Sequence, residues 1–353
     1  MAEAAPTDSA ATGFAWSGPV GTGLIRSLPE DFRVHEDVGY APSGDGEHLW
    51  LVVEKRGINT MDVVARLARL AGVPRSAVGF GGLKDRNALT VQPFSIHRPG
   101  PEMPDAAAWS DDDMRILSVT RHHRKIRRGR LAGNRFELTV REFCGDRERL
   151  AERLARIAAG GVPNGFGEQR FGGNNIARAH RLFRGELRRK PNRAKRGFYL
   201  SAARSLIFNR VLAARIAAGT WNRLIDGDIA MLEGSRSWFP ADPDDPELVA
   251  RAAALDLHPT GPLVGREPSP ATGAALEVEQ RVVEAERELA DGLAKFRLET
   301  DRRALRMRVP DLDWTLAGDV LELRFRLRPG CYATAVLREV LDYADASRNH
   351  WSP

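Results

Sequence analysis

The chain has 353 residues, of which 42% are hydrophobic and 28% charged, a composition typical of a globular protein that excludes an intrinsically disordered chain. No segment approaches the roughly 18 consecutive apolar residues of a transmembrane helix, so we expect no membrane anchor. The net charge is +6, and such an excess favours a polyanionic partner only where the positive charges are clustered.

The N-terminal residues and the cysteines indicate a cytoplasmic protein. Residues 1–22 lack the basic and apolar segments of a secretory signal, and we expect them to form a disordered tail. The two cysteines, Cys144 and Cys331, are isolated in the sequence, which excludes a disulfide framework or a cysteine-ligated zinc site. We expect both thiols to be reduced and half-buried.

The first part of the chain alternates strand and helix patterns. In chain order we expect strands within 24–38 and 47–56, a helix over 61–72, a strand, loop and strand over 78–96, a strand over 131–143 and a helix over 146–161. Asn59 or Thr60 can cap the first helix, and Gly72 can end it.

From about residue 161 to 295 the pattern is mostly helical. We expect helices over 201–219 and 275–296, and Pro/Gly-rich loops over 241–248 and 258–273. Strand patterns return after Thr300, and a helix follows from about Ala333. The sequence therefore predicts a mixed α+β core, whose last strands complete a sheet begun near the N-terminus, interrupted by a second domain.

The positive charge is clustered in two runs. Residues 121–130 read RHHRKIRRGR and residues 188–196 read RRKPNRAKR, each with six Arg or Lys and no acid. One such run alone is most simply solvated surface, but two in one chain favour a polyanion. Neither run is an amphipathic helix with a bulky apolar face, so a nucleic acid is preferred over a membrane surface. Charge alone does not distinguish DNA from RNA.

One carboxylate has a chemically suggestive neighbourhood. Asp85 lies in the predicted loop GLKDRNALT, between Lys84 and Arg86. An ionised and positioned Asp can act as a nucleophile or a general base, whereas the local pattern by itself favours a hairpin turn in which Asp85 caps the backbone. There is no phosphate-binding loop, nucleophile elbow or metalloprotease motif to compete with it.

Three further segments could bind a ligand, each with an ordinary structural alternative. Asn134 and Phe136 follow the first basic run and suit base recognition, or are a turn Asn and a core Phe. The glycine-rich segment 164–172 could contact nucleic acid or could be a junction loop. Tyr332 would lie at a strand-to-helix turn and Arg338 within the helix that follows, or the segment is a capped terminal helix with a surface Arg–Glu pair.

Taken together and in order, these segments resemble the TruD family of tRNA pseudouridine synthases. The matching motifs are GLKDRNALT, RHHRKIRRGRLAGNRFELTVRE, GVPNGFGEQRFGG, SAARSLIFNRVLAARI, GDIAMLEGSRSWF and RPGCYATAVLRE. The resemblance implies a pseudouridine synthase core of mixed sheet and helices at 23–158 and 303–353, interrupted by a mostly helical insertion domain at 159–302. It also implies isomerisation of uridine to pseudouridine at position 13 of the tRNA D-arm, with neither a metal nor an organic cofactor.

The resemblance also implies residue roles. Asp85 matches the catalytic aspartate, and the residues that would bind the target nucleotide are Phe32, Asn134, Phe136, Tyr332, Lys84 and Arg338. Tyr332 stands where the family usually has Phe, which adds a hydroxyl that needs a partner. Arg338, or alternatively Lys84, would be the cation beside Asp85. The expected RNA contacts are Arg121, Arg124, Lys125, Arg127, Arg128, Arg130, Gln169, Arg170, Arg188, Arg189, Lys190 and Arg193.

Two functions of different kinds follow from these features. The first is a tRNA-modifying enzyme that uses Asp85, working as a monomer with tRNA as its partner. The second is a tRNA-binding or tRNA-folding module on the same scaffold, without catalysis. A nuclease that uses His122 or His123 is a weaker third possibility. The route of catalysis, by attack on C1′ or through a glycal, stays open at this stage.

Overall fold

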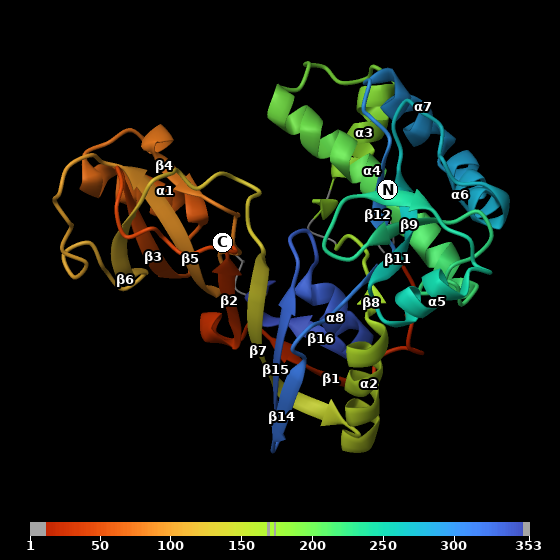
Figure 1. Ribbon diagram of the computed structural model, residues 1–353, viewed down its shortest axis with the longest axis horizontal. Helices are drawn as coiled ribbons and strands as arrows, with labels where there is room; N and C mark the ends of the chain where they lie inside the picture. Colours follow the sequence, from red (N-terminus) through yellow and green to blue (C-terminus); the bar gives the residue numbers. More distant parts are fainter. Residues whose placement is uncertain (1–11, 168–169, 173, 349–353) are drawn as a thin grey trace, which may run out of the picture. The chain divides into compact units, whose positions relative to one another are not determined.

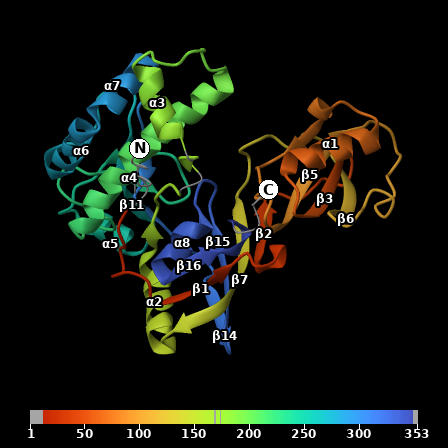
Figure 2. The same ribbon diagram turned by 180° about the vertical axis from the view of Figure 1, so that it is seen from behind.

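The computed structural model describes residues 12–167, 170–172 and 174–348 (Figures 1 and 2). The chain divides into two compact units, which we name the sheet unit and the helical unit. The sheet unit comprises Val20–Leu154, Val309–Ala333 and Leu341–Pro353, and the helical unit comprises Met1–Pro19, Ala155–Arg308 and Thr334–Val340. Within the described ranges, every helix is too short or too polar to span a bilayer.

The sheet unit is built on a ten-stranded sheet with the order β14-β15-β7-β2-β5-β3-β6, to which β1, β16 and β4 are added. Its strands are β1 (Gly21–Ile25), β2 (Phe32–Asp37), β3 (His48–Arg56), β4 (Val78–Phe80), β5 (Leu89–His97), β6 (Met114–His122), β7 (Gly133–Gly145), β14 (Asp313–Ala317), β15 (Val320–Leu327) and β16 (Leu341–Asp345). Because β15 pairs with β7, the strands after Thr300 complete the sheet begun near the N-terminus, as predicted. Strand β16, which the sequence did not predict, adds to the sheet by pairing with β1.

Helix α1 (Thr60–Ala71) covers one face of this sheet (Figure 1). Its Val63 and Leu67 are fully buried against Leu51 of β3 and Phe94 of β5. The expected glycine end is present, since Gly72 adopts φ 67°, a conformation that favours glycine. Helix α2 (Arg147–Gly160) follows β7 and runs from the sheet unit into the helical unit.

Strand register shows which residues share the α1 face, because directly paired residues point to the same side of a sheet. Lys55 is paired with Thr90, Thr90 with Val34, and Val34 with Phe136. Lys55 has the same parity on β3 as Leu51, whose side chain packs under α1. One face of the sheet therefore carries both the apolar core beneath α1 and, further along, the strand positions around Phe136.

The helical unit is organised around the long helix α4. Its elements are α3 (Asn175–Phe183), α4 (Arg193–Ala217), α5 (Pro246–Ala253), α6 (Gly273–Ala285), α7 (Arg287–Lys295), most of α8 (Ala333–Val340), the sheet β10 (Trp238–Pro240), β9 (Ile229–Leu232), β11 (Leu257–Leu263) and β12 (Asp301–Ala304), and the pair β8 (Val162–Pro163) and β13 (Arg306–Met307). Helices α3, α6 and α7 pack on α4. These compact units do not test where an insertion begins and ends in the sequence, so the boundaries at 159 and 302 stay a prediction.

Three local expectations in this unit are wrong. The Pro/Gly-rich segment expected as a loop contains β11, which is buried and hydrogen-bonded on both edges by β9 and β12. The single helix expected over 275–296 is two helices that break at Glu286. Helix α4 begins at Arg193, inside the second basic run, and not near 201. In each case tertiary pairing or packing overrides the local pattern.

Candidate active site

Asp85 lies in the loop between β4 and β5, and its carboxylate is held in place from two sides. One oxygen, Oδ2, accepts a hydrogen bond from Arg26 Nη2 at 3.0 Å, and Oδ1 accepts one from the backbone N–H of Asn87 at 3.1 Å. The side chain is 30% exposed, whereas that of Arg26 is 6% exposed. The acid is therefore fixed by buried groups and still reachable from solvent.

Arg26 joins two carboxylates. Its Nη1 lies 2.7 Å from Oδ2 of Asp345, while its Nη2 contacts Asp85. Its Cζ also lies 4.0 Å from the ring centroid of Phe32, a cation–π contact. Arg26 has φ 56°, a left-handed conformation that is uncommon for a residue with a side chain and is often found at functional sites. The end of β1 thus presents a guanidinium whose position is set by acids from two distant segments.

The main chain of the loop that carries Asp85 is anchored by the buried Lys55. Its Nζ donates to the carbonyl of Asp85 at 2.7 Å and to the carbonyl of Ile58 at 2.9 Å. Lys55 is fully buried, and this burial lowers the pKa of its ammonium to about 8, although the nearby Asp85 charge opposes the shift. A buried cation thus holds the loop through its backbone and leaves the Asp85 carboxylate free for other partners.

A second set of buried polar groups fixes the beginning of the loop. The hydroxyl of Thr60, at the start of α1, accepts from the N–H of Lys84 at 3.0 Å and donates to Gln92 Oε1 at 3.2 Å. The amide of Gln92 in turn donates to the carbonyl of Gly82 at 3.1 Å. The residues Thr60 and Gln92 therefore connect the loop to both α1 and β5.

The side chain of Lys84 forms an ion pair with Glu36 of β2. The Glu36 side chain is fully buried, and burial raises the pKa of its carboxyl while Lys84 works against that shift. Gly81 and Gly82 are required here, because a Cβ at either position would lie 2.4 Å or 2.9 Å from a carboxylate oxygen of Glu36. The glycines that precede Asp85 therefore make room for the buried pair.

Aromatic rings lie next to Arg26. The rings of Phe32 and Phe136 meet edge to face with centroids 6.2 Å apart, and Phe136 stacks on Phe325 of β15 at 5.5 Å. Asn134 lies two residues before Phe136 on β7, so both side chains point to the same side of the sheet. Its Oδ1 is buried with no hydrogen-bond partner among the described residues, a feature that native structures rarely leave without a reason.

The structure places the expected nucleotide-binding residues unequally. Asp85, Phe32 and Phe136 are linked by contacts through Arg26, which the sequence did not single out. Tyr332 is half-buried in the turn before α8, and no ring contact or hydrogen bond of its side chain is present within the described ranges. The partner expected for its hydroxyl is therefore not found there.

The expected cation beside Asp85 is corrected by the structure. Arg26 makes this ion pair, because the Lys84 ammonium is taken by Glu36. Arg338 belongs to the helical unit, where its guanidinium donates to Thr12 Oγ1 at 3.0 Å and lies over the ring of Phe14. The adjacency of Lys84 to Asp85 in the sequence was a misleading signal, because the two side chains leave the loop towards different partners.

The first basic run begins in the last residues of β6 and continues in the loop between β6 and β7. Ile126 holds this loop in place. This side chain is 1% exposed, and its N–H donates to Ser95 Oγ at 2.8 Å. The exposed cations of this loop, which we name the basic loop, are Arg124, Lys125, Arg127, Arg128 and Arg130. Within it, Lys125 contacts the carbonyl of Ser76, and Arg128 lies 4.6 Å over the Phe80 ring.

Arg121 was expected to contact RNA, but the structure places it in the interior. It is 9% exposed, and its guanidinium donates to the carbonyls of Arg98 at 2.9 Å and Glu102 at 2.7 Å. Its charge therefore holds a neighbouring segment in place, and it is not presented to a ligand.

The other expected RNA contacts lie in the helical unit. Arg188, Arg189, Lys190 and Arg193 are exposed. Arg170 is half-buried, with its Cζ 5.2 Å over the Phe166 ring. Gln169 lies outside the described residues. Of the two cysteines, Cys331 is half-buried as expected, whereas Cys144 is exposed.

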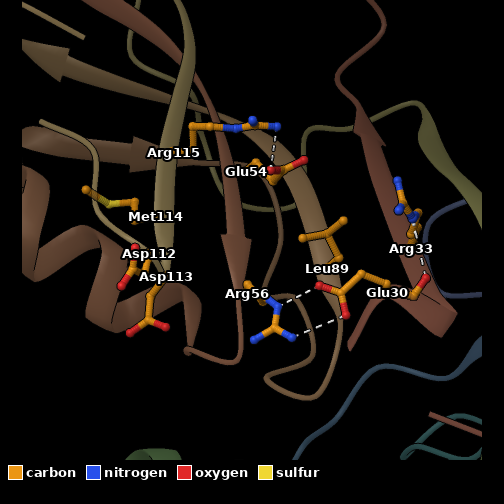
Figure 3. A pocket seen from close by; sticks show the side chains of 9 residues that line it. All are labelled: Glu30, Arg33, Glu54, Arg56, Leu89, Asp112, Asp113, Met114 and Arg115. Carbon is orange, nitrogen blue, oxygen red and sulfur yellow. Dashed lines mark hydrogen bonds and ion pairs between the residues drawn. The ribbon is translucent and has the colours of Figure 1, made fainter. Parts of the chain in front are cut away.

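A separate pocket of about 240 Å³ lies in the sheet unit, on the face of the sheet opposite to α1 (Figure 3). It is lined by Glu30, Arg33, Glu54, Arg56, Leu89, Asp112, Asp113, Met114 and Arg115. Arg33, Leu89 and Arg56 are paired in register and alternate with the residues of the α1 face. Its walls carry ion pairs, with Arg56 at 2.6 Å from Glu30 and Arg115 at 2.9 Å from Glu54. Asp85 is not part of it.

Comparison with known proteins assigns the fold. The chain is similar to the crystal structure of a protein from Methanosarcina mazei described as a tRNA pseudouridine synthase D (TruD), with a TM-score of 0.73 over 97% of this chain and 98% of that chain, at 22% identity. The chain therefore has the same α+β fold as that protein.

Comparison at the sequence level assigns the family. The family model described as tRNA pseudouridine synthase D (TruD) matches residues 11–189 and 174–340. Relatives named tRNA pseudouridine synthase D from Hydrogenovibrio crunogenus and Methylococcus capsulatus are 44% and 47% identical, over 93% and 91% of this chain and 95% and 91% of their own length. A relative of the same name from Pseudomonas syringae pv. tomato is 47% identical over 93% of this chain. The chain belongs to the TruD family of tRNA pseudouridine synthases, as its motifs indicate.

The double ion pair of Arg26 leads to a first prediction. Arg26→Lys keeps one charge but cannot reach Asp85 and Asp345 together, so one charge-assisted hydrogen bond is lost, worth about 1.5–3 kcal/mol. We expect kcat for the isomerisation of tRNA uridine to fall about 10- to 100-fold with the far-UV circular dichroism unchanged. Arg33→Lys, an exposed change on the other face of the same sheet, is the matched control. Full activity of Arg26→Lys would contradict this role.

The lowered pKa of Lys55 leads to a second prediction. Between about pH 8 and the ordinary pKa of 10.5, the unfolded chain holds a proton that folded Lys55 has released, so the stability contributed by this group rises with pH in that window. Lys55→Met lacks the group. The free energy of unfolding, measured with urea, should therefore rise for wild type relative to Lys55→Met between pH 7 and pH 10. If the two proteins differ in free energy of unfolding by the same amount at both pH values, the pKa of Lys55 is not lowered by burial.

Proposed function

We propose that this protein isomerises uridine to pseudouridine in tRNA, at position 13 of the D-arm, with Asp85 as the catalytic carboxylate and without a cofactor. The observation that carries the proposal is the Asp85 carboxylate, part-exposed and paired with Arg26, within a chain that matches the TruD family over nearly its whole length. Membership of the family supports the reaction, and the contacts of Asp85 support its role.

The reaction requires that uracil leave C1′ through N1 and return through C5. In one route, an Asp85 oxygen attacks C1′ as the N1–C1′ bond breaks, which gives an ester and a uracil anion. After rotation of the base, C5 attacks C1′ and expels the carboxylate, C5 then loses its proton and N1 gains one. In the other route, Asp85 removes a proton from C2′ and a glycal forms as uracil leaves. Both routes begin with an ionised carboxylate, which the Arg26 guanidinium compensates.

The detached uracil must be held while it turns. Phe136 and Phe32, which are 7% and 4% exposed, lie on the same side of the sheet as Asn134, whose Oδ1 is an acceptor without a partner among the described residues. Stacking holds a base without fixing its rotation about the ring normal, and an amide can bind the edges of uracil before and after it turns. We assign Phe136 and Asn134 these two roles, with Tyr332 as an additional nucleotide contact.

Binding energy must offset the cost of removing the target base from its stack, a few kcal/mol. The basic loop supplies exposed Arg and Lys side chains in the same unit as Asp85. Arginine binds phosphate with two hydrogen bonds in a fixed geometry, which positions the RNA as well as attracting it. We assign the basic loop to tRNA backbone contacts.

The proposal extends to the organisation of the protein. The sheet unit, with Asp85, is the catalytic core, and the insertion at 159–302 forms most of the helical unit and binds tRNA. We further propose that the protein acts as a cytoplasmic monomer with tRNA as its partner and needs no protein partner. The alternative of a tRNA-binding or tRNA-folding module is favoured by the two basic runs, and it differs in that its effect would not depend on the Asp85 carboxylate.

The role of Asp85 gives a third prediction. Asp85→Asn removes the negative charge of Asp85 and can keep only one of the two hydrogen bonds that the carboxylate accepts, from Arg26 or from the N–H of Asn87. The contact of Lys55 with the backbone carbonyl of residue 85 is retained, so the variant should fold and bind tRNA. Formation of the C5 bond expels the C5 hydrogen, so release of tritium from tRNA labelled at uracil C5 measures turnover. We expect release by wild type and by the control Asp112→Asn, an exposed acid of the same unit, and none by Asp85→Asn.

Other outcomes of this assay are equally informative. Turnover by Asp85→Asn would remove Asp85 from its catalytic role. No release by wild type, with tRNA binding intact, would favour the binding module. Chemical mapping of pseudouridine in the product then tests position 13, because modification elsewhere would contradict that part of the proposal alone.

The basic loop gives a fourth prediction. Changing Arg124, Arg127, Arg128 and Arg130 to Gln removes up to four phosphate contacts, each of which contributes about 0.7 to the slope of log K against log salt. We expect the slope for tRNA binding to decrease in magnitude by up to about 3. The control changes four ion-paired exposed arginines, Arg266, Arg287, Arg324 and Arg326, to Gln. An equal loss of slope in both variants would show that net charge, and not the loop, attracts the RNA.

A further inference from the structure

An aromatic side chain is exposed at the beginning of α4. Phe198 is 62% exposed, and every side chain from Arg193 to Phe198 lies at the surface. The next residue, Tyr199, is buried at 6%, and its hydroxyl accepts from Arg178 of α3 at 3.3 Å. The packed part of α4 therefore begins at Tyr199, and the turns of α4 before Tyr199 extend beyond the core of the helical unit (Figure 1).

Phe198 lies on the face of α4 that is buried further along the helix. Residues four and seven positions further along a helix share its face, and these are Ala202 and Ser205, exposed by 0% and 2%. The apolar side of α4 thus continues past the end of the core, and Phe198 is the first residue on it without a covering element among the described residues. Burial of this ring does not contribute to the stability of the unit.

The charges that precede Phe198 in the chain are equally unused by the fold. Arg188, Arg189, Lys190, Arg193, Lys195 and Arg196 are all exposed, and none forms an ion pair with the residues the structure describes. The start of α5 is different, because Asp245 caps that helix and Glu247 lies in its first turn. Cations at the start of a helix do not stabilise it, so the composition of this segment has no explanation within the chain.

The combination of an exposed flat ring and uncompensated cations fits one class of ligand. Single-stranded nucleic acid presents bases that stack on aromatic side chains and phosphates that bind Arg and Lys. A lipid surface fits less well, because Ala194 and Gly197 give the overhanging turns little apolar bulk beyond Phe198 itself.

We propose that Phe198 stacks on an unpaired base of the bound tRNA, with the cations of residues 188–196 on neighbouring phosphates, as an anchor in the helical unit. This inference rests on the proposed function in one respect, that tRNA is the substrate. It adds a base contact outside the sheet unit that contains Asp85. The anchor contributes to holding the tRNA, and not to the chemical step.

Binding of a full-length tRNA transcript tests the anchor, with Asp85→Asn as the background so that turnover does not interfere. We expect Phe198→Ala to raise Kd about 5- to 150-fold, the range for loss of one stacked base. Phe198→Trp should bind as tightly as the parent, whereas Phe198→Leu, which is apolar but not aromatic, should resemble Phe198→Ala. Trp238→Ala, which removes another exposed aromatic of the same unit, is the matched control and should leave Kd unchanged.

Salt dependence separates the ring from the charges. Phe198→Ala should leave the slope of log Kd against log salt unchanged, because stacking releases no counterions. Changing Arg193, Lys195 and Arg196 to Gln should reduce the magnitude of the slope by up to about 2. In the Asp85-containing enzyme, Phe198→Ala should raise KM for tRNA with little change in kcat. Thermal melting should be unaffected, since Phe198 is outside the core.

The outcomes distinguish this inference from the proposed function. If wild type releases no tritium but Phe198→Ala still weakens tRNA binding, the anchor stands and the catalytic proposal fails. If turnover is normal and Phe198→Ala binds tRNA as tightly as the parent, the anchor is overturned. Tight binding by Phe198→Leu would overturn the stacking contact. A dimer that Phe198→Ala abolishes, with tRNA affinity unchanged, would show that the ring contacts a second copy of this chain instead.

Discussion

The candidate active site of the sheet unit depends on one buried guanidinium with two carboxylates. Arg26 follows β1, Asp345 ends β16 and is paired in register with Ile25, and Asp85 comes from the loop before β5. A buried charge is costly unless it is paired, and Arg26 at 6% exposure has both pairs. The parallel pairing of β1 with β16 therefore does more than extend the sheet. It brings the acid from the last strand to the arginine that orients Asp85, so the site forms only when both ends of the core are in place.

The loop around Asp85 is fixed through its main chain, which leaves the carboxylate available. Lys55 binds the Asp85 carbonyl, Thr60 binds the Lys84 N–H, and Gln92 binds the Gly82 carbonyl. All three supporting side chains are fully or almost fully buried, so their positions are set by the sheet and α1. This arrangement explains why the two faces of the sheet differ so strongly. One face positions an acid by buried polar groups, whereas the pocket on the other is lined by charges that neutralise one another.

The sequence predicted the elements better than the partners. Most strands of the large sheet, α1 with its glycine end, and α2 follow from periodicity and turn residues, which are local properties. Asp85 could be singled out because it lies in a polar loop between two strands. Its true partner could not, because Arg26 is 59 residues away and nothing in its local sequence marks it. The flanking cations were misleading, since Lys84 pairs with Glu36 and Arg86 donates to the carbonyl of Gly57. Strands β6, β9, β10, β11 and β16 were missed, because pairing with distant segments and not local propensity determines them.

The same distinction decides which positive charges are functional. Counting Arg and Lys in the sequence treats Arg121 and Arg124 alike, yet Arg121 is bound to backbone carbonyls and Arg124 is exposed. A cation that already satisfies carbonyls or carboxylates has little left to offer a phosphate, because breaking those contacts would cost what the new one provides. A cation without an internal partner keeps its full charge for a ligand. By this criterion the second basic run, whose cations have no ion-pair partner among the described residues, is the stronger candidate for RNA binding, and the ring of Phe198 gives that surface a means of binding a base as well as the backbone.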